Sequence, residues 1–173
     1  MSAAFDFTGR PIGGLVLKAL DDVRFELAGA GDADELNRLF QRFFDEAHYR
    51  DRGIVYSPGR AGEWLQRVLS TGSTPHIVAR REGAIVGVVS FGLDDTFCER
   101  PVAVLHTVYV VPDQRRSAIG LILVMSAINL AREEGACAFH APIASGLKEQ
   151  ASLANLLRRC GCETIGTILG RSL

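Results

Sequence analysis

Two stretches in the first half of the chain carry apolar residues at the spacing of a helix. Asp32 and Glu35 match a capping box, so we predict that the first helix begins at Asp32. Its apolar face consists of Leu36, Leu39, Phe40, Phe43 and Phe44. The second helix follows Ser57 and Pro58, because proline suits the first helical position. Its apolar side consists of Trp64, Leu65, Val68 and Leu69.

Short apolar runs rich in β-branched residues indicate strands. Glu82 and Gly83 join two of these runs in a way that is typical of a tight hairpin. We expect strands at residues 15–20, 23–27, 76–80, 84–93, 102–111, 138–144 and 164–171.

Two more helices are expected in the second half of the chain, at residues 119–134 and 150–160. The first of them is amphipathic, and each is closed by a glycine, Gly135 or Gly161. The order of elements along the main body is strand, two helices, three strands, helix, strand, helix and strand. We expect residues 1–21 to be an N-terminal extension and 22–173 a single domain, since this length suits one full core.

Composition and charge exclude several classes of protein. The chain is 47% apolar and 23% charged, as globular proteins are, and no run of 18 apolar residues indicates a membrane span. A formal charge of −1 argues against a large nucleic-acid footprint. Residues 1–10 lack the basic-then-apolar order of a signal peptide, so we expect a cytoplasmic protein with no membrane or nucleic-acid partner.

The four cysteines give no sign of a metal site or a disulfide framework. Cys98, Cys137, Cys160 and Cys162 form no Cys-x-x-Cys pair, and no metal is implied. Because no export signal is visible, we expect reduced thiols that are mostly buried.

The segment between the strand at 102–111 and the helix from 119 has the features of an anion-binding turn. Pro112 stops the strand, Arg115 and Arg116 add permanent charge, and Ala118 and Gly120 leave the backbone accessible. The first N–H groups of a helix have no partner inside the helix, so they suit a phosphate. The alternative is an ordinary connection with Ser117 as the helix cap. The P-loop and dinucleotide-binding fingerprints both fail on spacing.

In this sequence the turn resembles motif A of the GNAT superfamily of N-acetyltransferases, which reads Gln/Arg-x-x-Gly-x-Gly/Ala. Arg115, Ala118 and Gly120 occupy the three fixed positions, with alanine in place of the first glycine. The order of elements over residues 22–173 is also similar to that of this superfamily. The resemblance implies a mixed α/β fold: a mostly antiparallel, twisted sheet flanked by about four helices, with two parallel strands that splay apart around acetyl-coenzyme A.

The resemblance also implies which residues contact the coenzyme. The pantetheine arm would lie in the gap between the splayed strands and pair with their backbone. The pyrophosphate would lie against the turn, and the last helix begins at Gln150, where the superfamily usually has asparagine. The implied coenzyme-binding residues are Val108, Tyr109, Val110, Arg115, Arg116, Ser117, Ala118, Ile119, Gly120, Leu121 and Gln150.

Acetyl transfer to an amine needs a base, and His106 is the first candidate. A pKa of about 6.5 suits proton acceptance near neutrality. Leu105 and His106 are similar to the Leu-His pair on the equivalent strand of arylalkylamine N-acetyltransferases. The alternative is a core histidine bonded to a backbone carbonyl. His140, on the strand after the motif helix, is a second candidate for lining the site, against a simple packing role.

The expected general acid is missing. Many members of the superfamily carry a tyrosine on the last helix, four residues before its closing glycine, and this chain has Leu157 there. Either another residue protonates the leaving thiolate or the thiolate leaves unaided, since a thiol pKa of about 8.5 makes it a tolerable leaving group. The other candidates are Cys160, Ser152 and Tyr109.

The connection between the first two helices is the expected acceptor site. It offers Glu46, Tyr49 and Tyr56, a carboxylate and two aromatic rings that suit a cationic amine. A solvated loop remains the alternative.

Taken together, these residues predict an acetyl-coenzyme A-dependent N-acetyltransferase that acts on a primary amine by direct attack. The acceptor can be a small molecule or a peptide, and the sequence leaves a homodimer open. Two rivals remain: a module of the same fold that binds acyl-coenzyme A without turnover, and a scaffold without coenzyme. The sequence does not specify the acceptor, the acid or the role of residues 1–21.

Overall fold

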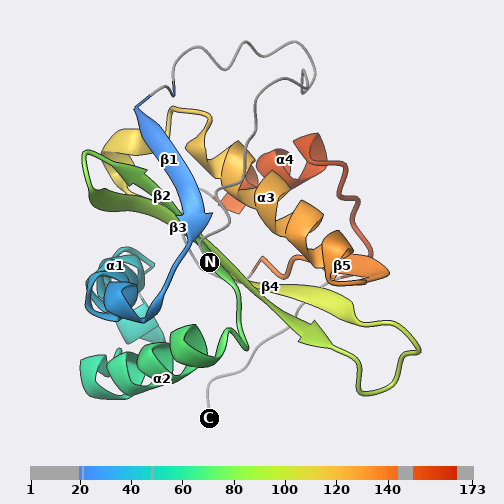
Figure 1. Ribbon diagram of the computed structural model, residues 1–173. Coiled ribbons are helices and arrows are strands. Elements are labelled where there is room, and N and C mark those ends of the chain that lie inside the picture. The colour runs from blue at the N-terminus through green and yellow to red at the C-terminus, as the bar shows by residue number, and fades with distance from the viewer. Residues whose placement is uncertain (1–19, 21, 48, 144–149, 167–173) are drawn as a thin grey trace.

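The computed structural model describes residues 20, 22–47, 49–143 and 150–166. Its centre is a five-stranded sheet whose strands lie side by side in chain order (Figure 1). Pairing is antiparallel from β1 to β4 and parallel between β4 and β5, so the predicted mixed, mostly antiparallel sheet is confirmed. The strands are β1 Val23–Leu27, β2 His76–Arg81, β3 Ala84–Asp94, β4 Val102–Val110 and β5 Ala138–His140.

Helices cover both faces of the sheet, and all four predicted α-helices are confirmed (Figure 1). One face carries α1 (Ala33–Glu46) and α2 (Pro58–Thr71), and the other carries α3 (Ile119–Glu133) and α4 (Gln150–Arg159). The short 3-10 helices are η1 (Ala30–Asp32), η2 (Tyr49–Arg52) and η3 (Pro112–Gln114).

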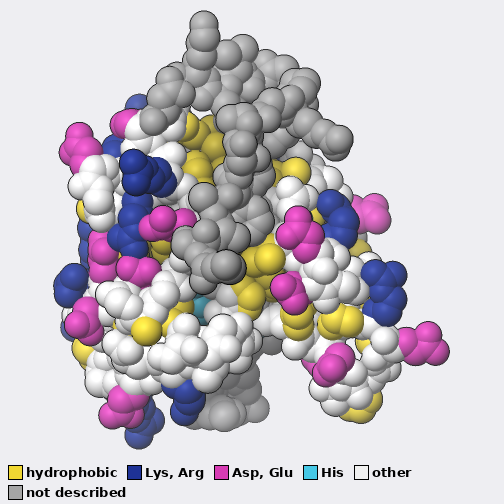
Figure 2. All heavy atoms as spheres, viewed as in Figure 1, with side chains coloured by type: hydrophobic (Ala, Val, Ile, Leu, Met, Phe, Trp, Pro, Cys, Tyr) yellow, Lys and Arg dark blue, Asp and Glu magenta, His cyan; other side chains and the backbone are white. Residues whose placement is uncertain are grey.

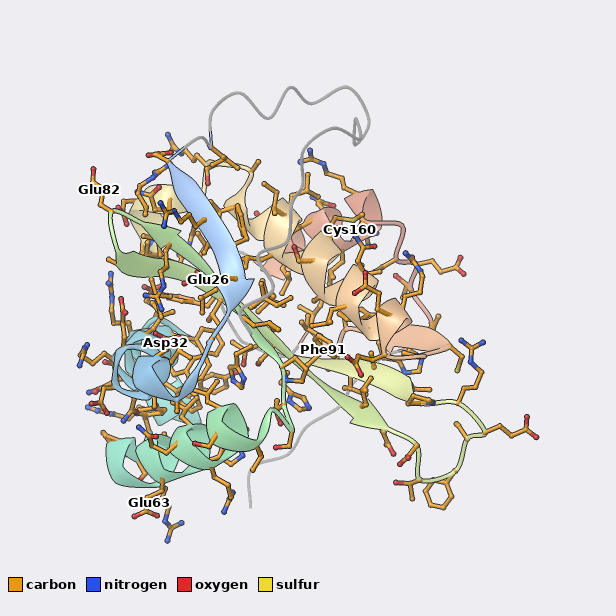
Figure 3. All side chains as sticks on the ribbon, viewed as in Figure 1. Glu26, Asp32, Glu63, Glu82, Phe91 and Cys160 are labelled. Carbon is orange, nitrogen blue, oxygen red and sulfur yellow. The ribbon has the colours of Figure 1, made fainter. Side chains whose placement is uncertain are left out.

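The two faces of the sheet build two separate apolar cores. On the α3 face, Phe91 of β3 packs in one core with Leu123 of α3 (Figure 3). On the opposite face, Val88 of the same strand packs in the other core with Leu36 of α1. Side chains alternate between the faces of a strand, so the nearly continuous apolar run of β3 serves both cores.

α3 differs from the amphipathic helix that we predicted. Four consecutive residues, Leu121 to Val124, are all buried. The reason is that the sheet covers one side of the helix, while Leu157 of α4 belongs to the same core. A helix enclosed by other elements is apolar all round.

Three predicted strands are shorter than expected or lie partly outside the described residues. The strand predicted at 138–144 ends at His140, shortly before Pro142, which has no N–H for pairing. Residues 164–166 form no strand, and the rest of the strand predicted at 164–171 lies outside the described residues. Residues 15–19, part of a further predicted strand, lie outside them as well.

The predicted capping box at Asp32 and Glu35 is wrong. Asp32 is the N-cap residue of α1, but its side chain caps no N–H of that helix. It accepts the N–H of Gly29 at 2.9 Å and a hydrogen bond from Arg80. Glu35 accepts the N–H of Ile85 at 2.6 Å and bonds to Arg80 at 3.2 Å. A nearby guanidinium forms stronger, charge-assisted hydrogen bonds than a helix N–H does, so both carboxylates turn toward it.

Arg80 of β2 joins β1, η1 and α1 through three carboxylates. Its Nε donates to Glu26 at 2.6 Å, Nη1 donates to Glu35, and Nη2 donates to Asp32. Figure 3 shows Glu26 and Asp32 on the same side of the molecule. The Arg80 side chain is only 18% exposed, so solvent screens this network less than it screens an isolated surface ion pair.

Removing the guanidinium should therefore destabilise the fold. We expect Arg80→Met to lower the free energy of unfolding by about 2–3 kcal/mol, because three carboxylates then face one another without a cation. Urea denaturation followed by circular dichroism measures the effect. The matched control is Arg67→Met on the exposed side of α2, which should change the free energy by no more than about 0.5 kcal/mol. Equal losses in the two variants would contradict the role of the network.

The cysteines are less buried than we predicted. Cys98 and Cys137 are exposed, and Cys160 and Cys162 are partly buried. The expectation of mostly buried thiols is therefore wrong, and the reason is their position. Cys98 lies in the connection between β3 and β4, and the other three lie at or beyond the ends of α3 and α4.

On the face seen in Figure 2, the described side chains carry both signs of charge. Figure 2 shows basic and acidic side chains interspersed over the side formed by β1, β2 and α1. Of the helices in the described ranges, none combines the length and the apolar character that crossing a membrane would require.

Candidate functional site

β4 and β5 separate after a short stretch of pairing. Pairing joins Val102–Val104 to Ala138–His140, whereas β3 stays paired with β4 as far as Val110. Within the described residues, the β5-side edge of β4 therefore has no strand beside it beyond Val104. Such an edge offers N–H and C=O groups to an extended ligand.

The start of α3 presents unpaired N–H groups close to the end of β4. Ile119 donates to Ser117 Oγ at 3.3 Å, and Ile122 donates to the carbonyl of Ala118 at 3.0 Å. Between them, Gly120 and Leu121 have no acceptor for their N–H groups in the part of the chain that the structure describes. These N–H groups lie at the positive end of the helix dipole, so they suit an anion.

Gly120 is the point where β4, α3 and α4 meet. A methyl group added at Gly120 would lie 3.5 Å from Leu156 of α4 and 3.8 Å from Val110 of β4. These are ordinary contact distances, and the backbone of Gly120 has no positive φ. Packing against the described residues therefore does not require glycine here, whereas close approach of a ligand to the backbone would.

Ser117 only partly fits the interpretation as a helix cap. The N-cap residue of α3 is Ala118, and no side chain caps that end in the usual way. Ser117 Oγ instead accepts the N–H of Ile119 and donates to the carbonyl of Gln114 at 2.6 Å. Ser117 and Arg116 are both exposed, so both are accessible to a ligand at this turn.

Arg115 is bound within the protein. Its Nε donates to the carbonyl of Val110 at 2.9 Å, and Nη2 forms an ion pair with Glu46 at the end of α1. The guanidinium also lies over the ring of Tyr109, 5.4 Å from its centroid. The structure thus uses Arg115 to join the turn to α1 across the end of the sheet.

Glu46 and Tyr109 complete this arrangement. Tyr109 is buried in the core on the α1 face and donates its hydroxyl to Glu46 at 2.5 Å. Burial and the Glu46 carboxylate raise the pKa of Tyr109 to about 12. The Tyr109 side chain therefore lies on the face away from α3, and its proton is held by Glu46.

His106 lies at an irregularity of β4. Ser90 pairs with Thr107 and Phe91 pairs with Leu105, so His106 is an extra residue with no partner on β3. Such a bulge changes the direction of a side chain, and bulges are common next to active sites. The side chain is exposed, and partial burial lowers the pKa of His106 below 6.5, which favours the neutral, proton-accepting form.

The alternative of a core histidine fits His76 rather than His106. His76 is 1% exposed, and its Nδ1 donates to the carbonyl of Thr74 at 2.8 Å. Burial lowers the pKa of His76. Its Nε2 has no partner among the described residues. His76 is therefore a neutral histidine in the core on the α1 and α2 face.

His140 lies at the end of β5, paired with Val104 of β4. Its neighbour Phe139 packs against the core on the α3 face, so alternation places His140 on the opposite face. His140 is exposed there.

The structure shows where Leu157 and the candidates for the general acid lie. Leu157 is buried in the core on the α3 face, so it is a packing residue. Cys160, at the end of α4, has a pKa raised to about 11 by burial (Figure 3). Ser152 is exposed on α4. The Gln150 side chain lies outside the described atoms, although its backbone begins the helix.

Of the residues expected to line the acceptor site, Tyr49 and Tyr56 belong to an aromatic cluster with Phe44 of α1. Phe44 contacts Tyr49 and Tyr56 with ring centroids 4.7 Å and 4.9 Å apart. Tyr56 donates its hydroxyl to the side chain of Asn37 at 2.6 Å, and burial raises its pKa to about 12. The rings of Tyr49 and Tyr56 therefore pack against α1. These contacts do not fit the alternative of a solvated loop.

Sequence reasoning missed two features of this region. The first is the ion pair between Arg115 and Glu46, which are 69 positions apart. The second is Gly92 of β3, which lies under the ring of His106. The ion pair has no local sequence signal. Gly92 has a weak one, because a glycine inside an apolar strand often marks a close approach.

Comparisons with known proteins agree with the architecture. The model of the acetyltransferase (GNAT) family matches residues 33–162. No curated protein matches the sequence.

Solved structures of acetyltransferases have the same fold. One is described as a probable acetyltransferase, with a TM-score of 0.70, 18% identity, and coverage of 87% of this chain and 96% of that one. A second is an aminoglycoside acetyltransferase from an uncultured soil metagenomic sample, in complex with sisomicin. Its TM-score is 0.69 at 20% identity, and the match covers 88% of this chain and 97% of that one. A third is an aminoglycoside N-acetyltransferase in complex with CoA. Its TM-score is 0.70 at 10% identity, and the match covers 86% of this chain and 93% of that one. At these identities the likeness shows the fold alone.

Proposed function

Because the chain belongs to the acetyltransferase (GNAT) family, we propose that it moves an acetyl group from acetyl-coenzyme A to a primary amine. The observation that carries the proposal is the start of α3. There the unpaired N–H groups of Gly120 and Leu121 meet the open edge of β4. The fold likeness to an N-acetyltransferase in complex with CoA supports the same assignment.

The coenzyme would be held by two parts of the site. The N–H groups of Gly120 and Leu121, with the exposed guanidinium of Arg116, would hold the diphosphate. The edge of β4 near Val108 and Val110 would lie along the pantetheine arm as a neighbouring strand does. Arg115 forms an ion pair with Glu46 and donates to the carbonyl of Val110, so it would hold the turn in place beside the diphosphate.

The reaction needs a neutral amine, a stabilised oxyanion and a leaving thiolate. His106 would take the proton from the ammonium of the acceptor, directly or through water, because its lowered pKa keeps the ring neutral at pH 7. A backbone N–H of β4 would donate to the oxyanion. The thiolate needs little help to leave, since a thiol pKa is about 8.5, and this suits the presence of Leu157 where many relatives carry an acid.

The acceptor would be a small-molecule amine. Two structural neighbours are aminoglycoside acetyltransferases, which makes aminoglycosides the first compounds to test, followed by polyamines, amino acids and a lysine peptide. Glu46, Tyr49 and Tyr56 would contact the acceptor, and Glu46 also binds Arg115 and Tyr109.

Two measurements on the folded protein test the proposal. Titration calorimetry with acetyl-coenzyme A should show saturable binding, and free thiol should be released in the steady state with at least one amine of the panel. Saturable binding with no thiol release on any acceptor would instead support a module that binds the coenzyme without turnover. No heat of binding would leave only a scaffold and would end the proposal.

A further inference from the structure

The ring of His106 occupies the space that a side chain at Gly92 would take, so with any larger residue there the ring would have to move. A Cβ atom built at Gly92 would lie 2.8 Å from Cε1 and 3.0 Å from Nε2 of His106. Real Cβ atoms essentially never approach another heavy atom so closely. The imidazole therefore lies across β3, directly over the backbone of Gly92.

The backbone itself does not require glycine at this position. Among the described residues, the glycines with positive φ are Gly53, Gly72, Gly83, Gly135 and Gly161. Gly92 is not one of them, and it lies inside β3, paired with Val104. Glycine inside a strand weakens it, because it has no side chain to pack and loses more chain entropy on folding. The space taken by the His106 ring gives a reason for glycine where the backbone gives none.

The bulge in β4 lies beside Gly92 and acts on the same side chain. Because pairing changes between Ser90 and Phe91, His106 is the unpaired residue of β4 opposite that step, and Gly92 is the residue of β3 that follows Phe91. The bulge and the missing side chain thus act together: one turns His106 toward β3, and the other gives its ring room there. The charge of His106 contributes to the lowered pKa of His76, after burial of His76 itself.

We propose that Gly92 is a positioning residue for His106, which holds the imidazole against β3 by leaving the space that the ring occupies. This inference rests on the proposed role of His106 as the base, but the placement of the ring can be tested without any turnover.

The main test is the variant Gly92→Ala, which forces the ring out of its place. We expect kcat at pH 7 to fall about 10-fold to 100-fold with unchanged affinity for acetyl-coenzyme A, since general-base catalysis contributes about 10²–10⁴ and a displaced base keeps part of it. The imidazole resonances of His106 should shift, and its pKa should rise toward 6.5 as the ring moves into water. Leu93→Ala, at the next and exposed position of β3, is the control and should change neither quantity.

A stability cycle tests the same contact without relying on activity. Gly92→Ala should lower the melting temperature in the parent, because the ring must move. In the His106→Ala background the new methyl group meets no ring, so the same substitution should not lower it. An equal loss in both backgrounds, or an unchanged His106 resonance in Gly92→Ala, would overturn the proposal. If the protein acetylates no amine while these shifts occur, the proposed function fails and the placement of His106 by Gly92 stands.

Discussion

Replacing Gly120 with glutamate is expected to weaken binding of acetyl-coenzyme A by at least about 100-fold. A carboxylate at this position would lie where the N–H groups of α3 meet the diphosphate, and like charges at close range in a partly buried site repel strongly. A 100-fold loss corresponds to about 2.7 kcal/mol of binding free energy. Titration calorimetry on the folded variant measures it.

The chain offers a close control for this substitution. Gly59 is the second residue of α2, as Gly120 is of α3, and a side chain there would meet nothing within 4 Å. Gly59→Glu should therefore bind the coenzyme as the parent does. Gly120→Gln keeps the shape of the glutamate without its charge and should give a smaller loss than Gly120→Glu. Unchanged affinity in Gly120→Glu would remove the start of α3 from the coenzyme site.

Removing the imidazole of His106 is expected to lower turnover by about 10²–10⁴ at pH 7, the usual contribution of a general base. The pKa of His106 lies below 6.5, so the parent has a neutral base at pH 7 and loses activity as the pH falls through that pKa. In His106→Ala the inflection at this pKa disappears, and activity falls steadily with falling pH because the acceptor amine stays protonated. Activity recovers as the pH rises, because the acceptor amine, with a pKa near about 10.4, then loses its proton unaided.

The pH dependence separates this role from a structural one. Steady-state thiol release from pH 5.5 to 9.5 gives the profile, and calorimetry checks that affinity for acetyl-coenzyme A is unchanged. His106→Gln keeps a polar side chain without a titrating group and should follow His106→Ala. A parallel drop at every pH, with the profile of the parent, would assign His106 to structure and not to proton transfer.

Local patterns along the chain were sufficient for most of the fold. Apolar residues at helical spacing predicted α1 and α2, and alternation together with Glu82 and Gly83 predicted the hairpin of β2 and β3. The predictions failed at the capping box and at the strand predicted for 138–144, which ends at His140. Glu35 can bond to the backbone N–H at the start of α1 or to Arg80. The charged Arg80, 45 positions away on β2, forms the stronger hydrogen bond.

The candidate site was predicted only in part. The turn between β4 and α3 was placed correctly from Pro112 and the small residues after it, because a strand end and a helix start are local features. The partners of its side chains were not predictable. Arg115 binds Glu46 at the end of α1, which meets the turn only because both elements contribute to the same end of the sheet.

The sequence by itself therefore determined the order of the strands and helices from β1 to α4, the position of the turn between β4 and α3, and which histidine to propose as the base. Those features depend on the spacing of residues that are close together in the sequence, and this spacing does not depend on the tertiary structure. Only the tertiary structure decided that Arg115 binds a carboxylate of the same chain and that the ring of His106 lies over Gly92. Both depend on strand register and on which helix covers which face, because side chains distant along the chain compete for one partner or one space.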